Sequence, residues 1–384
     1  MASISNPFII NGKIPTEYFC DRVDESASLI KLLLNGNNVV LTSPRRVGKT
    51  GLVEHCFQQS ELNEKYHTIF VDILGTSNLR EFTYVFGQQI FEALKTKSQK
   101  LIDLFFNTVR SISGEFGYDV ITGLPKFNIS LGAIENPQHT LNEIFTYIDK
   151  ADRRCIIAID EFQQIVNYPE KNIEAILRTH IQHCSNANFI FAGSERHILA
   201  EMFNSYSRPF YASTSPLNLD ELKLDKYSEF VTRLFEKFGK TIDSQIIEYV
   251  YGLFDGNTYC MQKTFNATFS ATETECSMQI AEDSIASILL ENERNYQSRL
   301  ALLPPKPKEL LIAIAKDGVA QRLTSGEFIR RHKLSSASSV QSATNQLLAN
   351  DWITYSITDG YKKFFLTDKF MTLWLKDQFG QGWR

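Results

Sequence analysis

The chain has 384 residues, of which 43% are hydrophobic and 22% charged, and its formal net charge is −4. This composition is typical of a soluble globular protein and argues against strong binding of polyanions by the molecule as a whole. The length predicts two or three domains. The start lacks a signal-peptide pattern, no apolar run reaches transmembrane length, and the six cysteines include no Cys-x-x-Cys pair. We therefore expect a cytoplasmic protein with reduced thiols, no membrane partner and no zinc site.

A phosphate-binding motif follows the first predicted strand. Residues 1–20 are expected to form an irregular lead-in, residues 21–35 an amphipathic helix and residues 39–41 a buried strand. The next loop reads Ser43-Pro44-Arg45-Arg46-Val47-Gly48-Lys49-Thr50, and a predicted helix continues from Gly51. A strand, a tight loop with Gly-Lys-Thr and a helix form the layout of a nucleoside triphosphate site, in which backbone N–H groups and the helix N-terminus surround a phosphate.

Several residues of this loop have specific expected roles. Lys49 is predicted to reach the β- and γ-phosphates, and Thr50 to place its hydroxyl on Mg²⁺. The motif has glycine at its first position, where this chain has Ser43, a small residue that a turn tolerates. The two arginines at the loop tip have no single interpretation. One could pair with a carboxylate such as that of Asp72 or Asp160, and the other could face a partner subunit.

The second half of such a site is an apolar strand that ends in acidic residues. Residues 155–159 are apolar and lead into Asp160 and Glu161. Asp160 is expected to hold Mg²⁺ through water, and Glu161 to orient and polarise the attacking water. The alternative is a core strand that happens to end in two acids, which the phosphate-binding loop upstream disfavours.

Further apolar runs indicate how the strands are arranged. Residues 68–72 and 188–194 read as strands that alternate with amphipathic helices, which predicts an α/β fold with a parallel sheet covered by helices on both faces. Ligands bind at the carboxyl ends of such strands, where Lys49, Asp160 and Ser194 would meet. Ser194 is either a sensor of the γ-phosphate or an ordinary residue of the turn that ends its strand.

The remaining chain contains an insertion, a helical lid and a C-terminal domain. Residues 116–133 are predicted to form a β-hairpin, and the amphipathic spacing over residues 222–298 predicts helices. The proline-rich residues 303–307 are expected to form a stiff linker. The predicted domains are a core at 1–221, a lid at 222–300 and a C-terminal domain at 301–384.

The C-terminal domain has the pattern of a winged helix-turn-helix. Its predicted elements are helices at 308–315, 326–332 and 335–350 and strands at 352–355 and 361–365. Asp359-Gly360 supplies the hairpin turn between the two strands. Residues 301–384 carry 12 Lys+Arg against 7 Asp+Glu, a net charge of +5 in an otherwise acidic chain.

Two partners of this domain, DNA and protein, stay open. The polar residues predicted to face outward from the third helix, and able to contact base edges, are Ser338, Ser339, Gln341, Ser342 and Asn345. The basic residues that could contact phosphates are Arg330, Arg331, Lys333, Lys362 and Lys363. The third helix itself contains no Arg or Lys, which equally suits a domain that docks proteins.

Together these motifs resemble the archaeal-type ATPase family of AAA+/STAND-related P-loop proteins, which also occurs in bacteria. The matching segments are residues 19–22 with Glu25, the 43–50 loop, 159–162, 192–194, and 256–262, which is similar to the family's Gly-x-Pro-Tyr-x-x-Gln stretch without its proline. The resemblance implies an AAA+-like core with a helical lid and winged helix. It also implies binding of ATP and ADP with Mg²⁺, hydrolysis, and conformational change passed from lid to winged helix.

The resemblance also assigns residues outside the loop. It places Phe19 and Arg22 beside the adenine and ribose, although the segment with Asp21 also reads as a simple helix N-cap. Tyr259 and Gln262 are expected near the contact between core and lid. Arg208 resembles an arginine finger that acts on a neighbouring subunit, which would require a homo-oligomer, or it is an ordinary surface arginine.

Two classes of function fit the sequence. The first is an ATP-driven switch that acts on DNA or on a protein. The second is a signalling or scaffold module that binds nucleotide and turns it over slowly or not at all. Glu161 favours the first, because a pure binder does not need a water-activating carboxylate. A metabolic kinase is disfavoured, since no constellation of residues for a small acceptor substrate is evident.

Overall fold

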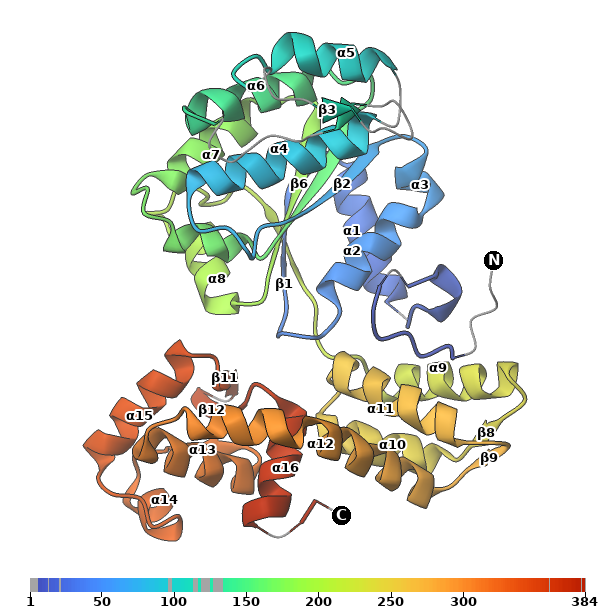
Figure 1. The fold of residues 1–384 in the computed structure, drawn as a ribbon, viewed down its shortest axis with the longest axis vertical. Helices are drawn as coiled ribbons and strands as arrows, with labels where there is room; N and C mark the ends of the chain where they lie inside the picture. Colours follow the sequence, from blue (N-terminus) through green and yellow to red (C-terminus); the bar gives the residue numbers. More distant parts are fainter. Residues whose placement is uncertain are drawn as a thin grey trace. The chain divides into compact units, whose positions relative to one another are not determined.

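The computed structural model describes most of the chain, which divides into two compact units. The described residues are 6–12, 14–20, 22–95, 99–112, 117–118, 125–126, 134–358, 360–380 and 382–383. One unit, the core, consists of residues 11–222. The other consists of the residues before Asn11 together with those after Leu222. Figure 1 labels the helices and strands of both units.

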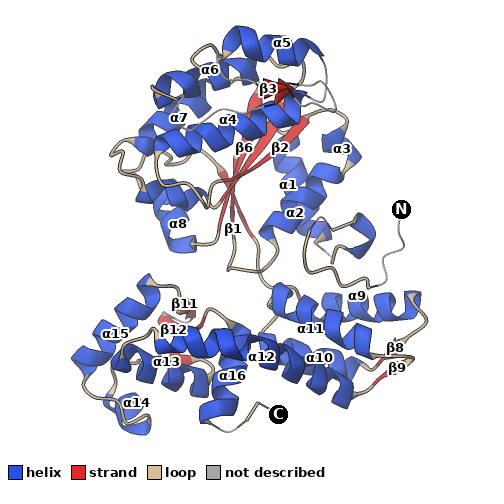
Figure 2. Ribbon diagram, viewed as in Figure 1, coloured by secondary structure: helices blue, strands red, loops and turns tan. Residues whose placement is uncertain are grey.

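A five-stranded parallel sheet forms the centre of the core (Figure 2). Its strands are β1 (Val39–Thr42), β2 (His67–Asp72), β5 (Cys155–Asp160), β6 (Ala187–Gly193) and β7 (Ser215–Asn218). Their order is β2-β5-β6-β1-β7, and every neighbouring pair is parallel. The four predicted strands are therefore confirmed. The short edge strand β7 was not predicted, because a run containing Pro216 gives a weak strand signal, and an edge position is where a strand tolerates proline.

Helices cover both faces of this sheet. They are α1 (Val23–Leu34), α2 (Lys49–Gln58), α3 (Ser60–Asn63), α4 (Leu79–Lys95), α5 (Gln99–Thr108), α6 (Pro137–Asp149), α7 (Ile173–His183) and α8 (Arg196–Asn204), with 3₁₀ turns η1 (Thr16–Tyr18) and η3 (Phe162–Asn167). Side chains of β5 point alternately to the two faces. Ile157 and Ile159 join one hydrophobic cluster, and Ile156 and Ala158 join the other. This double burial explains why the strand reads as a continuous apolar run.

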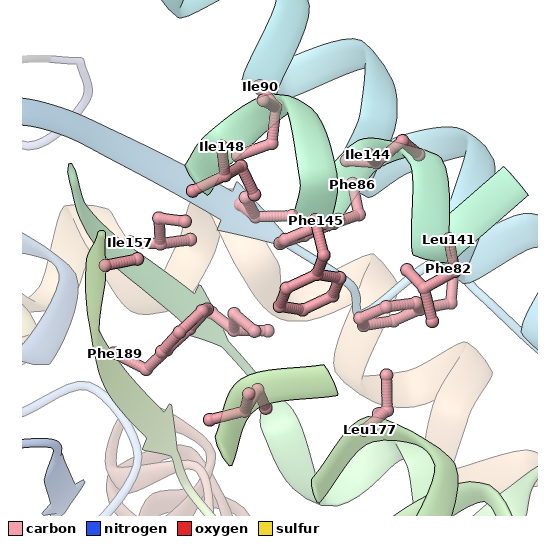
Figure 3. Close-up of a cluster of buried hydrophobic side chains, with 14 of the residues drawn as sticks. Phe82, Phe86, Ile90, Leu141, Ile144, Phe145, Ile148, Ile157, Leu177 and Phe189 are labelled. Carbon is pink, nitrogen blue, oxygen red and sulfur yellow. The ribbon is translucent and has the colours of Figure 1, made fainter. Parts of the chain in front are cut away.

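The larger cluster is rich in aromatic rings (Figure 3). Phe145 of α6 lies 5.5 Å from Phe86 of α4 and 6.1 Å from Phe189 of β6, measured between ring centroids. These contacts join two helices to the sheet. Of the hairpin predicted at 116–133, the structure describes β3 (Gly117–Tyr118) and β4 (Pro125–Lys126), which pair antiparallel. The other residues of that range lie outside the described chain.

The second unit begins with a helical lid. Its elements are α9 (Leu224–Lys237), β8 (Thr241–Ile242), α10 (Ser244–Phe254), α11 (Thr258–Ala271), β9 (Glu275–Cys276) and α12 (Met278–Ala301). The N-terminal segment packs here, although the sequence assigned it to the core. Phe8 is fully buried among four phenylalanine rings of α9 and α11, at 5.8–6.2 Å. Asn266 donates a 2.7 Å hydrogen bond to the Phe8 carbonyl and accepts one from Asn6.

The winged helix follows the lid, as predicted. It comprises α13 (Pro305–Asp317), β10 (Ala320–Gln321), α14 (Gly326–Arg331), α15 (Ala337–Ala349), β11 (Ile353–Thr358), β12 (Tyr361–Leu366) and α16 (Lys369–Phe379). The strands form an antiparallel sheet in the order β10-β12-β11. Ser325 caps α14 by accepting a hydrogen bond from the Phe328 N–H.

The predicted proline linker at 303–307 is wrong. Helix α12 ends at Ala301 and α13 begins at Pro305, so three residues separate the helices. Pro305 and Pro307 lie in the first turn of α13. Proline is tolerated there, because the N–H group that it lacks would have no hydrogen-bond partner within the helix. No helix in the described part of the chain is long and apolar enough to cross a membrane.

Candidate nucleotide-binding site

The loop between β1 and α2 has the geometry of a phosphate cradle. Arg46 and Gly48 both have positive φ angles, 64° and 97°, which turn the chain sharply into α2. Helix α2 begins at Lys49, so the N–H groups of its first turn have no partner within the helix. An anion at this end would satisfy such groups and would be favoured by the helix dipole.

Lys49 is the buried cation of this loop, with 7% of its surface exposed. Its Nζ donates to the hydroxyl of Ser43 at 3.1 Å, so the serine at the first motif position serves as a partner for the lysine. Burial lowers the pKa of Lys49, and the nearby carboxylates of Glu161 and Asp160 oppose that shift. A buried ammonium whose described hydrogen bond is to one neutral hydroxyl fits a site that receives an anion.

Thr50 and Asp160 meet beside this lysine. The Thr50 hydroxyl donates to Oδ2 of Asp160 at 2.7 Å, and Oδ1 accepts from the backbone N–H of Glu161 at 3.0 Å. Burial raises the pKa of Asp160, against the effect of the Thr50 hydrogen bond. The described residues include no cluster of three or more acidic, His or Cys side chains that could hold a metal. Mg²⁺ is commonly held by one carboxylate, a hydroxyl and substrate phosphates, which this pair fits.

Glu161 is held by two side chains from adjacent strand ends. Its backbone is left-handed, with φ 54°, directly after β5. Ser194, after β6, donates its hydroxyl to Glu161 Oε2 at 2.8 Å and accepts from Nε of Arg45 at 3.4 Å. Gln163 donates its amide to the same Oε2. The structure therefore connects the loop arginine, Ser194 and Glu161, which the sequence could only place at one edge of the sheet.

Arg22, just before α1, contacts the phosphate-binding loop. Its guanidinium donates to the backbone carbonyl of Val47 at 3.2 Å and pairs with Glu25 at 2.9 Å, and the residue is 5% exposed. Arg22 itself occupies the N-cap position of α1, without a side-chain cap. The predicted cap, Asp21, lies outside the described residues.

Phe19 lies against helix α2. Its ring stacks on His55 with 4.2 Å between ring centroids and an interplanar angle of 8°. A Cβ atom at Gly51 would lie 3.5 Å from the Phe19 ring, an ordinary van der Waals distance, so Phe19 packs against the first turn of α2. A role of Phe19 at the adenine stays a prediction.

Arg208 is paired elsewhere in the core, and the two predicted lid residues belong to the other unit. Arg208 forms ion pairs within its own chain, with Glu174 at 3.0 Å and Glu201 at 3.8 Å. Burial raises the pKa of Glu174, and the charge of Arg208 opposes that shift. Tyr259 and Gln262 lie on α11, in the other unit. The predicted finger role of Arg208 and the nucleotide role of the lid residues stay predictions.

Two residues of the site were missed in the sequence. Gln163 follows the acidic pair, but its residue type gives no signal, because Gln164 beside it is identical and forms a different hydrogen bond. Arg196 donates to the Leu219 carbonyl at 3.2 Å, and its positive charge contributes to the lowered pKa of Lys49. No local pattern could have placed Arg196 near that lysine, because the approach depends on how α8 follows β6.

The fold and this cluster define a P-loop ATPase of AAA+-like architecture. The chain belongs to the family described as the ATPase domain predominantly from Archaea, which matches residues 19–264. Residues 294–377 match a probable winged helix domain. Both matches confirm the resemblance seen in the motifs. Membership of this family implies nucleotide binding and suggests ATP hydrolysis. No curated protein matches the chain.

Solved structures share the fold along nearly the whole chain. A Walker-type ATPase from Pyrococcus abyssi has a TM-score of 0.67 at 17% identity, over 96% of this chain and 99% of that one. The ORC2 protein of Aeropyrum pernix, in ADPNP–ADP complexes, has a TM-score of 0.61 at 13% identity, over 97% and 96%. At such identities the similarity concerns the fold alone.

Proposed function

We propose that this protein is a Mg²⁺-dependent ATPase that works as a molecular switch, in which ATP binding and hydrolysis in the core change the placement of a winged helix that acts on DNA or on a protein. The observation that carries the proposal is the convergence of Lys49, the Thr50–Asp160 pair and the Ser194–Glu161 pair at one edge of the sheet. Phosphoryl transfer needs little beyond such positioning and charge.

Each residue has a separate task in this reaction. Lys49 and the loop bind the phosphates of ATP, and Thr50 and Asp160 would hold Mg²⁺, which supplies positive charge against the phosphate oxygens. Glu161 orients a water molecule and accepts its proton. The water oxygen forms a bond to the γ-phosphorus, and the bond from the γ-phosphorus to the bridging oxygen breaks with its electron pair left on ADP. Glu161 then returns the proton to solvent.

Observations on the winged helix support both classes of partner. Ser338, Gln341 and Ser342 are exposed along α15, as a helix that reads base edges would require. Arg331, however, is paired with Asp317 at 2.6 Å, and the hydrophobic Ile357 of β11 is 67% exposed. The first observation supports DNA, and the other two support a protein partner.

ATP turnover with and without EDTA and duplex DNA tests the proposal. The matched variant is Glu161→Gln, which keeps the size of the side chain but removes the proton acceptor. We expect it to retain ATP affinity and to lose about two to four orders of magnitude in turnover rate. Wild-type protein that binds ATP with no turnover beyond that of Glu161→Gln would instead support the slow nucleotide-binding module. Acceleration by DNA would identify the partner.

A further inference from the structure

Gln163 is a buried amide with an unusual set of partners. It lies in η3, two residues after Glu161, and is 3% exposed. Its Nε2 donates to Glu161 Oε2, while its Oε1 is buried without a hydrogen-bond partner in the described chain. A carboxylate only accepts hydrogen bonds, so the NH₂ end of the amide faces Glu161. The unsatisfied oxygen makes this placement unfavourable for stability.

The neighbouring strand makes room for this amide. A Cβ atom at Gly193, the last residue of β6, would lie 2.1 Å from Gln163 Oε1 and 2.8 Å from a methyl group of Leu199. Only glycine therefore allows Gln163 to lie where it does. The next residue, Ser194, donates a hydrogen bond to the same Glu161 oxygen. The end of β6 therefore supplies both a donor to the Glu161 carboxylate and the space that the Gln163 amide occupies.

The hydrogen bonds distinguish the two oxygens of Glu161. Both side-chain donors, Ser194 and Gln163, end on Oε2. Within the described residues no hydrogen bond ends on Oε1. Because the backbone of Glu161 is left-handed, the direction of its side chain is not that of a regular strand and depends on these contacts.

We propose that Gln163 is a positioning residue for ATP hydrolysis: together with Ser194 it fixes Oε2 of Glu161, so that Oε1 is the oxygen that accepts the proton of the attacking water. This role rests on the proposed ATPase function. It explains why a buried amide with an unsatisfied oxygen stands beside the acidic pair. A mere space-filling role would be served better by an apolar side chain of similar volume.

The test is Gln163→Met, which keeps length and volume but removes the donor. Its matched control is Gln164→Met, which loses a hydrogen bond donated to the carbonyl of Thr76 and one accepted from Asn167, neither of which involves Glu161. For Gln163→Met we expect kcat to fall roughly 100-fold, as a misplaced catalytic group typically costs, with ATP affinity and KM within about twofold of wild type. Its thermal unfolding temperature should be unchanged or raised. Gln164→Met should keep kcat.

A double-mutant cycle separates positioning from a general structural effect. In single-turnover measurements, Gln163→Met is expected to change the rate little when combined with Glu161→Gln, because the carboxylate through which it acts is absent. Full kcat in Gln163→Met, or a lowered kcat accompanied by lost stability and lost ATP affinity, would overturn the proposal. Absence of turnover in the wild type would overturn the ATPase function itself, and the two failures are thus distinct.

Discussion

Lys49 lies buried with the Ser43 hydroxyl as its hydrogen-bond partner, and burial lowers the pKa of its ammonium group. A buried charge in this position is unfavourable until an anion pairs with it. We therefore expect Lys49→Ala to abolish ATP binding while the unfolding temperature of the nucleotide-free protein stays the same or rises. Calorimetric titration with ATP and Mg²⁺, and thermal unfolding with and without nucleotide, measure the two effects.

Lys65→Ala is the matched control, because it removes an exposed ammonium from the same unit. This variant should keep both its ATP affinity and the rise in unfolding temperature that ATP produces by binding only the folded state. The anion-binding role of Lys49 would be contradicted by an unchanged ATP affinity in Lys49→Ala.

The main site residues could be predicted because local spacing fixes their chemistry. Lys49 and Thr50 follow a strand in a recognisable loop, and Asp160 ends another, so the sheet topology alone brings them together. Gln163 could not be predicted in the same way, since its contact depends on the left-handed turn at Glu161 and on the space left by a glycine of another strand.

At the scale of elements, the proline-rich segment after α12 shows how one signal has two meanings. Proline is frequent in extended linkers and also at the first position of helices. Here Pro304 is the N-cap residue and Pro305 the first residue of α13. The segment is helical here because α13 has an apolar face, on which Leu310, Leu311 and Ile314 are buried.

The N-terminal segment is an element whose place no local pattern predicted. Phe8 lies fully buried among the rings of Phe230, Phe235, Phe265 and Phe269. Truncation of a buried phenylalanine typically costs about 3–5 kcal/mol. We expect Phe8→Ala to lower the free energy of unfolding of the lid and winged-helix unit by an amount of this order.

Tryptophan fluorescence during urea unfolding reports on this unit, because all three tryptophans, Trp352, Trp374 and Trp383, belong to it. The control is Leu302→Ala, at a site that is 82% exposed, where a change within about 0.5 kcal/mol is expected. If Phe8→Ala unfolds at the same urea concentration as the control, the segment does not stabilise the lid.

At the scale of the whole molecule, the lid and the winged helix form one compact unit. Phe370 of α16 packs on Phe254 of α10 at 4.9 Å between ring centroids, and Lys369 pairs with Asp255 at 2.7 Å. Tyr296 of α12 contacts a tryptophan of α16 at 5.6 Å. These contacts replace the predicted linker as the means by which the lid holds the winged helix.

The chain crosses between the two units twice, after Ile10 and after Leu222. Any movement of the lid relative to the core must therefore be accommodated at two connections. Tyr259 and Gln262 of α11 are the residues that we expect to respond to the γ-phosphate. A nucleotide shifts the equilibrium between two arrangements of lid and core only if it binds one arrangement more tightly than the other.

We therefore predict that ATP and ADP change the distance from core to winged helix while the distance from lid to winged helix stays constant. Spin labels can be attached at Lys65→Cys in the core, Glu236→Cys in the lid and Ile357→Cys in the wing, three exposed positions. All six native cysteines are buried, so the introduced thiols are the reactive ones. A changing lid-to-wing distance would show that the two parts move separately. Identical core-to-wing distances in the nucleotide-free, ADP and ATP-analogue states would leave the chain a rigid nucleotide binder.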